Sequence, residues 1–151
     1  WTRKQISEDN LNFLSLLPYT YKLDDIYFVH STPLEPEEWH YVFTWNDAMS
    51  QFDHFEEKIC FIGHSHVPQI YYSDTNTTMS FSLNKETKYL INVGSIGQPR
   101  DGNPRLSFGI FETDKWYYQP FRSEYNMEAT AKKIRERGLP IFLADRLIKG
   151  R

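Results

Sequence analysis

The most constraining feature of the sequence is the stretch ICFIGHSHVPQIYY, residues 59–72. Four apolar residues run into Gly63, His64 and His66 follow one residue apart, and apolar and aromatic residues then resume. Short apolar runs bounded by turn residues are typical of buried strands. At the carboxyl end of a strand the backbone is still nearly extended, so residues i and i+2 point the same way. The pattern therefore predicts two imidazoles that face one point, with Gly63 leaving room for the backbone to turn.

A third histidine has the same setting. The segment DDIYFVHSTP predicts a buried strand over 26–29 that delivers His30 to its carboxyl end. If the two strands share a sheet, all three imidazoles project from one rim, where ligands collect in open α/β sheets. Imidazole suits Zn, Fe, Mn and Ni, so His30, His64 and His66 are the candidate metal ligands. An isolated His-x-His pair also occurs by chance, and His40 and His54, which lie among acidic residues, are expected at the surface.

The remaining segments predict the fold class. Helices are expected over 2–16, over 47–56 with Asn46 as N-cap, and in two C-terminal pieces separated by Gly138 and Pro140. Short aromatic or β-branched runs predict strands over 58–62, 69–73, 79–83, 88–93, 105–112 and 116–121. The sequence thus predicts an α/β fold with a mixed sheet, antiparallel hairpins in the second half and C-terminal helices. A length of 151 residues predicts one domain over 1–151.

Charge and composition narrow the classes of function. The net charge is −3 and no basic cluster stands out, so no nucleic-acid partner is expected. No apolar run approaches the roughly 20 residues of a membrane-spanning helix, and the first residues do not form a basic-then-apolar leader, so no membrane partner is expected. The only cysteine, Cys60, lies in an apolar run and is expected to be a small buried hydrophobe. A reducing, cytoplasmic location follows as an expectation.

A second motif, YLINVGSIGQPRDGNPRLSFGIFE, covers residues 89–112. One interpretation is two strands joined by a glycine loop, with Arg100 and Asp101 in solvent. The other is a backbone that passes close beside a site, where Ser95, Gln98 or Arg100 could reach a bound anion. Arg100 is therefore the candidate substrate-binding residue.

Together, FVHSTP, FIGHSHVPQ, INVGSIGQPRDGNPRLSFGIFE and AKKIRERGLPIFLADRLIKG resemble the calcineurin-like metallophosphoesterase superfamily, in its small bacterial and archaeal branch. The resemblance spans nearly the whole chain in the expected order. It implies a four-layer α/β sandwich with two divalent metal ions, Mn, Fe, Zn or Ni, that hydrolyses a phosphomonoester or phosphodiester substrate. It also implies that His30 and His64 ligate one metal and His66 the other.

The chain departs from that family in its first half. The family pattern begins with Asp-x-His, Gly-Asp and Gly-Asn-His-Asp motifs, and none of these is present. We therefore expect the chain to correspond to the C-terminal part of such a domain, with the general acid outside it and little or no activity alone. We also expect its exposed apolar strands to be covered by the missing N-terminal segment or by another copy in a homo-oligomer.

Two other functions stay open. The same fold serves, by family resemblance, as a scaffold or protein-interaction module when its metal ligands are lost. The three intact histidines favour the enzyme. A mononuclear zinc hydrolase built on these histidines alone is disfavoured, because metal-binding imidazoles usually need carboxylates that orient them, and none can be identified in the sequence.

Overall fold

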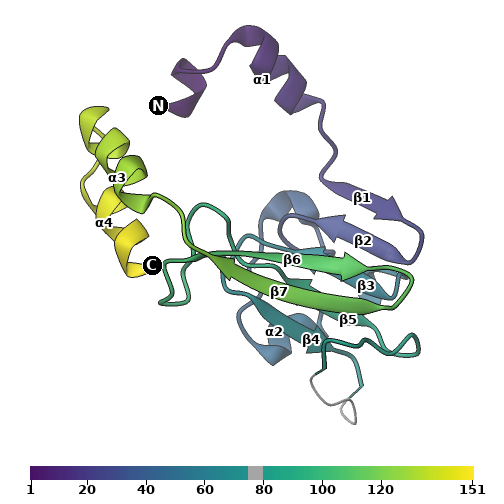
Figure 1. Cartoon of the computed structure of the whole chain (residues 1–151). Helices are drawn as coiled ribbons and strands as arrows, with labels where there is room; N and C mark the ends of the chain where they lie inside the picture. Colours follow the sequence, from purple (N-terminus) through teal and green to yellow (C-terminus); the bar gives the residue numbers. More distant parts are fainter. Residues whose placement is uncertain (75–79) are drawn as a thin grey trace.

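The computed structural model describes residues 1–74 and 80–151. Its main element is a five-stranded sheet with the strand order β1-β2-β3-β5-β4 (Figure 1). The strands are β1 Thr20–Leu23, β2 Ile26–Val29, β3 Ile59–Ile62, β4 Gln69–Tyr72 and β5 Tyr89–Asn92. The central strands β2, β3 and β5 run parallel, and the two edge strands are antiparallel to their neighbours. A second, two-stranded sheet is the antiparallel hairpin of β6 Leu106–Glu112 and β7 Tyr117–Ser123.

Alternation along β3 builds a core on each face of the main sheet. Cys60 and Ile62 point to one face, where they meet residues of α2 (Trp45–Met49) and of the following 3-10 turn, η3 (Phe52–His54). Ile59 and Phe61 point to the other face, where they pack with residues of β6 and β7. The β6–β7 hairpin accordingly lies over the main sheet in Figure 1, with α2 on the far side. These contacts follow from the period of two in strand side chains.

The remaining helices lie outside these layers. In Figure 1, α1 (Glu8–Ser15) stands apart from both sheets, and none of its residues is buried. The C-terminal helices α3 (Met127–Glu136) and α4 (Phe142–Lys149) pack against each other. Gly150 ends α4 in the left-handed conformation, and its carbonyl accepts from the N–H of Gly102 at 2.9 Å. This bond holds the end of α4 to the loop before β6.

The predicted fold class is confirmed. The structure has a mixed sheet, antiparallel strands in the second half and C-terminal helices. The strand over 26–29 has its predicted bounds, and the expected antiparallel pairing appears between β4 and β5 and between β6 and β7. The expectation of one domain stays a prediction. No helix within the described residues is long and apolar enough to cross a membrane.

Two helix predictions were wrong in their bounds. A 3-10 turn over Thr2–Lys4 replaces the first part of the helix expected over 2–16, because Ser7 is extended and its hydroxyl caps α1 by accepting from Asn10 N–H. The helix expected over 47–56 begins at Trp45, since Thr44, not Asn46, is the N-cap. Thr44 and Asp47 form a capping box, which sets the start of a helix through reciprocal side-chain to backbone bonds.

Two strand predictions also differ from the structure. Of the strand expected over 79–83, Met79 lies outside the described residues, and Ser82 makes only an isolated bridge with Tyr117. The edge strand β1 was not predicted. Its side chains are mostly exposed, so they lack the apolar pattern by which a buried strand is found.

Candidate metal centre

The three predicted histidines lie at one edge of the main sheet. His30 follows β2 and His64 follows β3, and these strands are parallel neighbours, so their carboxyl ends coincide. The backbone links them directly, because Gly63 N–H donates to the carbonyl of His30 at 2.9 Å. The ring centroids of His30 and His64 are 5.3 Å apart. Both rings and His66 line a cavity of about 920 Å³ that opens between the two sheets.

The backbone of the histidine loop is not extended, contrary to the sequence-based argument. His64 has a φ of 59° and His66 a φ of 61°, both in the left-handed region. The N–H of Ser65 donates to the carbonyl of Gly63 at 2.7 Å, which closes a three-residue turn centred on His64. A γ-turn with positive central φ is rare and strained. Strained non-glycine residues cluster at ligand sites and persist only when their surroundings hold them in place.

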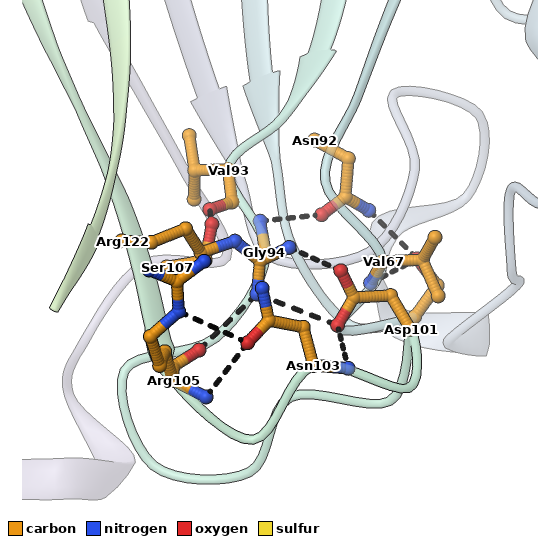
Figure 2. Close-up of polar contacts among 10 residues, drawn as sticks. Val67, Asn92, Val93, Gly94, Asp101, Asn103, Arg105, Ser107 and Arg122 are labelled. Atoms are coloured by element: carbon orange, nitrogen blue, oxygen red, sulfur yellow. Dashed lines mark hydrogen bonds and ion pairs between the residues drawn. The ribbon is translucent and has the colours of Figure 1, made fainter. Parts of the chain in front are cut away.

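Glycine is required in this region at Gly94 and not at Gly63. A Cβ built on Gly63 would make only ordinary contact, 3.6 Å from the carbonyl oxygen of His30. Gly94 has a φ of +80°, and a Cβ there would lie 2.6 Å from the Ser107 side chain. The Ser107 hydroxyl in turn donates to the carbonyl of Val93 at 2.9 Å (Figure 2). The close approach of backbone and side chain therefore occurs where β5 leaves the sheet.

Two ring hydrogen bonds define the tautomers. His64 Nε2 lies 3.0 Å from the carbonyl oxygen of Trp39, and His66 Nδ1 lies 2.7 Å from the carbonyl oxygen of Gln98. A carbonyl can only accept, so each of these nitrogens carries the proton. In the neutral imidazoles, the lone pair then resides on Nδ1 of His64 and on Nε2 of His66. A ring nitrogen that donates to a carbonyl while the other keeps its lone pair is the usual arrangement of metal-binding histidines.

Burial keeps two of the rings neutral. The pKa of His30 is lowered, first by burial and then by the nearby His64. The pKa of His66 is also lowered, mainly by burial and further by Arg100, although the bond to Gln98 acts in the opposite direction. Desolvation disfavours the charged imidazolium. Both rings therefore keep a lone pair available at neutral pH.

Aromatic side chains surround His64, and the sequence-based analysis did not place them at the site. The ring of Tyr41 stacks on His64 with centroids 4.1 Å apart. The ring centroid of Trp39 lies 5.6 Å from that of His30 and 5.7 Å from that of His64. The backbone of Trp39 is in the left-handed region, with a φ of 57°. The aromatic run WHYVFTW was a visible signal in the sequence. Its relation to the histidines depends on how the loop after β2 folds back.

Arg100 lies next to His66 and is not paired with a carboxylate among the described residues. Its N–H donates to the carbonyl of His66 at 3.2 Å. Its buried Nε has no hydrogen-bond partner within the described part of the chain. The neighbouring Asp101 pairs instead with Arg122 (Figure 2). Arg100 thus holds a positive charge near His66 without a carboxylate partner among the described residues.

The other two candidates from this loop are used within it. The Ser95 hydroxyl accepts from the N–H groups of Gly97 and Gln98, at 3.3 and 3.0 Å. Gln98 serves the site through its carbonyl, which orients His66. Of the three candidates, Ser95 lines the cavity, and Gln98 and Arg100 do not.

The described residues contain no group of three or more His, Cys, Asp or Glu side chains arranged to hold one metal ion. This finding argues against a mononuclear site built on the three histidines. The chemistry of these donors suits divalent transition metals, for which neutral imidazole is a common ligand.

The fold and the histidine edge define a class, and comparison with known proteins identifies it. The model of the calcineurin-like phosphoesterase superfamily domain matches residues 5–116, and the chain belongs to this superfamily. Its members are phosphoesterases, a class of hydrolases, and typically bind divalent metals.

Individual relatives agree with this assignment. An uncharacterised protein of Methanocaldococcus jannaschii is 36% identical over 158 residues, which cover 100% of this chain and 64% of that protein. A crystal structure of a metallophosphoesterase from Sphaerobacter thermophilus superposes with a TM-score of 0.91 and 36% identity, covering 100% of this chain and 66% of that one. A hypothetical protein from Pyrococcus horikoshii shares the fold, with a TM-score of 0.78, 15% identity and coverage of 98% and 57%. The chain therefore spans slightly less than two thirds of the first two relatives' length.

Proposed function

We propose that this chain supplies the histidine half of a dinuclear metal centre that hydrolyses phosphate esters. The observation that carries the proposal is the meeting of His30, His64 and His66 at one cavity edge. Each of the two rings with an assigned tautomer has a lone pair to offer, because a backbone carbonyl takes its other nitrogen. The substrate is a phosphomonoester or phosphodiester.

The three imidazoles divide between two ions in this proposal. His30 and His64, with ring centroids 5.3 Å apart, are close enough to share one ion, and His66 serves the other. The ions are Mn, Fe, Zn or Ni, all of which accept imidazole. When bound, they supply Lewis-acid catalysis, since they polarise the phosphoryl group and lower the pKa of water.

Arg100 is the proposed substrate contact. Its guanidinium has no carboxylate partner among the described residues, and its buried Nε lacks a hydrogen-bond acceptor there. Arginine binds phosphate through charge-assisted hydrogen bonds, and the terminal nitrogens of this guanidinium are proposed to take a phosphoryl oxygen. Its role is to bind and orient the ester, and the general acid is proposed to lie outside this chain.

The remaining ligands are proposed to come from a further part of the parent domain or from a second copy of the chain. Asp101, the carboxylate next to Arg100 in the sequence, is paired with Arg122. Apolar side chains around the cavity are also exposed, including Phe28, Ile96 and Phe108. A covering segment would bury these side chains and complete the metal centre. A cytoplasmic location is proposed from the free, buried Cys60.

The alternative is a scaffold of the same fold. It is favoured by one observation, the lack of a metal-holding cluster of three ligands among the described residues. A scaffold would have no reason to keep three imidazoles at one edge, two of them with a ring nitrogen oriented by a carbonyl. The retained geometry therefore favours the enzyme.

The test uses the parent protein and p-nitrophenyl phosphate with Mn²⁺. His66→Ala is expected to lower hydrolysis by orders of magnitude while the fold is retained, because it removes a ligand at the cavity and little core packing. His54→Ala is the control, since the side chain of His54 is exposed at the end of η3, and it should leave activity unchanged. Equal losses in the two variants, or activity that a chelator does not abolish, would contradict the proposal. The chain of 151 residues by itself should show little or no turnover.

A further inference from the structure

We propose that Asn92 is a positioning residue of this centre, whose buried carboxamide holds the Gly63–Ser65 turn in the shape that presents His64. The purpose assigned to His64 rests on the proposed function. The geometric role of Asn92 does not, and it can be tested separately.

The location of Asn92 places its amide under the histidine loop. It is the last residue of β5, a strand that lies between β3 and β4, and only 2% of it is exposed. In the parallel pairing of β3 with β5, Asn92 stands opposite Ile62, the last residue before Gly63. The side chain therefore reaches the first peptide of the loop from the neighbouring strand.

Asn92 uses its amide on three partners. Nδ2 donates to the carbonyl of Gly63 at 2.6 Å and to the hydroxyl of Ser65 at 2.8 Å. Oδ1 accepts from the N–H of Gly94 at 2.9 Å, a bond visible in Figure 2. Only a group with both donors and an acceptor can make this set, and a carboxamide is such a group.

The hydrogen bonds of Asn92 hold the two residues that flank His64, the residue of the turn with a strained backbone. The carbonyl of Gly63 accepts from Asn92 and also from the N–H of Ser65, the bond that closes the turn around His64. The positive φ of His64 costs free energy and persists only when surrounding contacts hold it. Asn92 binds the backbone carbonyl of Gly63 before His64 and the side-chain hydroxyl of Ser65 after it, while the carbonyl of Trp39 holds the ring. Together they orient the imidazole.

The same amide is connected to the second histidine. Its oxygen holds Gly94, the start of the loop that continues to Gln98, whose carbonyl orients His66. Within that loop, the Ser95 hydroxyl accepts from the N–H of Gln98. One buried side chain thus joins the two loops that set the geometry of His64 and His66.

The test is Asn92→Asp, which keeps the shape and the acceptor for Gly94 but removes both donors. Histidine tautomers are read from long-range ¹H–¹⁵N NMR spectra of the 151-residue chain at a fixed pH of about 8, above the ordinary histidine pKa. In the unsubstituted chain, His64 should be the Nε2–H tautomer and His66 the Nδ1–H tautomer. In Asn92→Asp, the two ring nitrogen resonances of His64 should move toward each other, as its tautomers mix. His54 should not change.

Asn103→Asp is the matched control. Asn103 lies in the loop before β6, where its Oδ1 accepts from the backbone N–H and from Nε of Arg105 (Figure 2). The Asn103→Asp substitution therefore adds the same negative charge at a residue that makes no hydrogen bond to the Gly63–Ser65 turn. Its spectrum should match that of the unsubstituted chain. A merely structural Asn92 would lower the urea midpoint of Asn92→Asp and leave the His64 tautomer of the folded state unchanged, and that result would overturn the proposal.

A second variant covers failure to fold. Ser65→Ala removes one of the groups that accept a hydrogen bond from Asn92. The two ring nitrogen resonances of His64 should therefore move toward each other in this variant too, but by less than in Asn92→Asp. If Asn92→Asp does not fold, unchanged ring nitrogen resonances of His64 in Ser65→Ala would overturn the proposal. Failure of the proposed function looks different, because the histidine signals of the parent protein would not respond to Zn²⁺ while His64 still responds to Asn92→Asp.

Discussion

The ring of His66 is held by the backbone of Gln98, with Nδ1 2.7 Å from the carbonyl oxygen. The amide nitrogen of asparagine lies as many bonds from the backbone as Nδ1, so His66→Asn can keep this bond while it removes Nε2. We expect His66→Asn to change the free energy of unfolding by less than about 0.5 kcal/mol. His66→Ala should cost about 1 kcal/mol, because the bond is lost. Urea denaturation of both variants measures this, and equal losses would show that the bond does not stabilise the fold.

Gly94→Ala should destabilise the fold strongly. Its φ of +80° and the 2.6 Å approach to Ser107 combine left-handed strain with a steric clash. The expected loss is about 2–5 kcal/mol, the sum of roughly 1–2 for the backbone and 1–3 for overpacking. Gly97→Ala in the same loop is the control, since a Cβ there meets nothing within 4 Å. Similar unfolding free energies for the two variants would contradict this account.

Lys88 should stabilise the segment from Phe52 to Phe55, which follows α2, through two side-chain hydrogen bonds. Its Nζ donates to the carbonyls of Phe52 and Phe55 at 3.0 and 2.6 Å. Lys88→Met leaves two carbonyls of buried residues without this donor and should cost about 1–3 kcal/mol. Lys85→Met, at an exposed position over the ring of Trp116, should change stability by less than about 0.5 kcal/mol. Thermal or urea unfolding of the two variants measures the difference. Equal losses of stability in Lys88→Met and Lys85→Met would contradict this role of Lys88.

Tyr118 should make stability fall at high pH. Burial raises its pKa to about 12, above the ordinary value of 10.0. A raised folded-state pKa contributes stability that is present below pH 10 and is lost as the pH rises through about 12. The loss should be about 2–3 kcal/mol across that window. Urea unfolding at pH 9 and near pH 12 should show a smaller decrease for Tyr118→Phe, and equal decreases would refute the assignment.

Cys60 should be unreactive in the folded chain. Its side chain is fully buried, and burial, with a smaller effect of Glu57, raises the pKa of the thiol well above its ordinary value. The thiolate is the reactive form, so a thiol reagent at pH 8 should modify Cys60 only after urea is added. Rapid modification without denaturant would mean that the sheet opens around β3.

Local patterns predicted the elements that have strong local causes. The strand over Ile26–Val29 is marked by a continuous apolar run, and its bounds were correct. The first helix was predicted too early because Ser7, a side chain that can cap the helix, competes with helix formation from Thr2. Likewise, α2 begins after Thr44, which forms a capping box with Asp47, and not after the predicted N-cap Asn46. Helix ends depend on individual side-chain bonds, which periodicity does not reveal.

The sequence by itself determined that His30 and His64 end apolar strands and that the chain resembles one half of a metallophosphoesterase site. That much follows from short-range order, because apolar runs and turn residues set where strands stop. The tertiary structure alone decided the left-handed turn at His64 and the bond from Asn92 to Gly63, 29 residues away. It also brought the carbonyls of Trp39 and Gln98 to rings 25 and 32 residues distant. Such contacts depend on the order of strands in the sheet, and a strand order is set by packing across the whole domain.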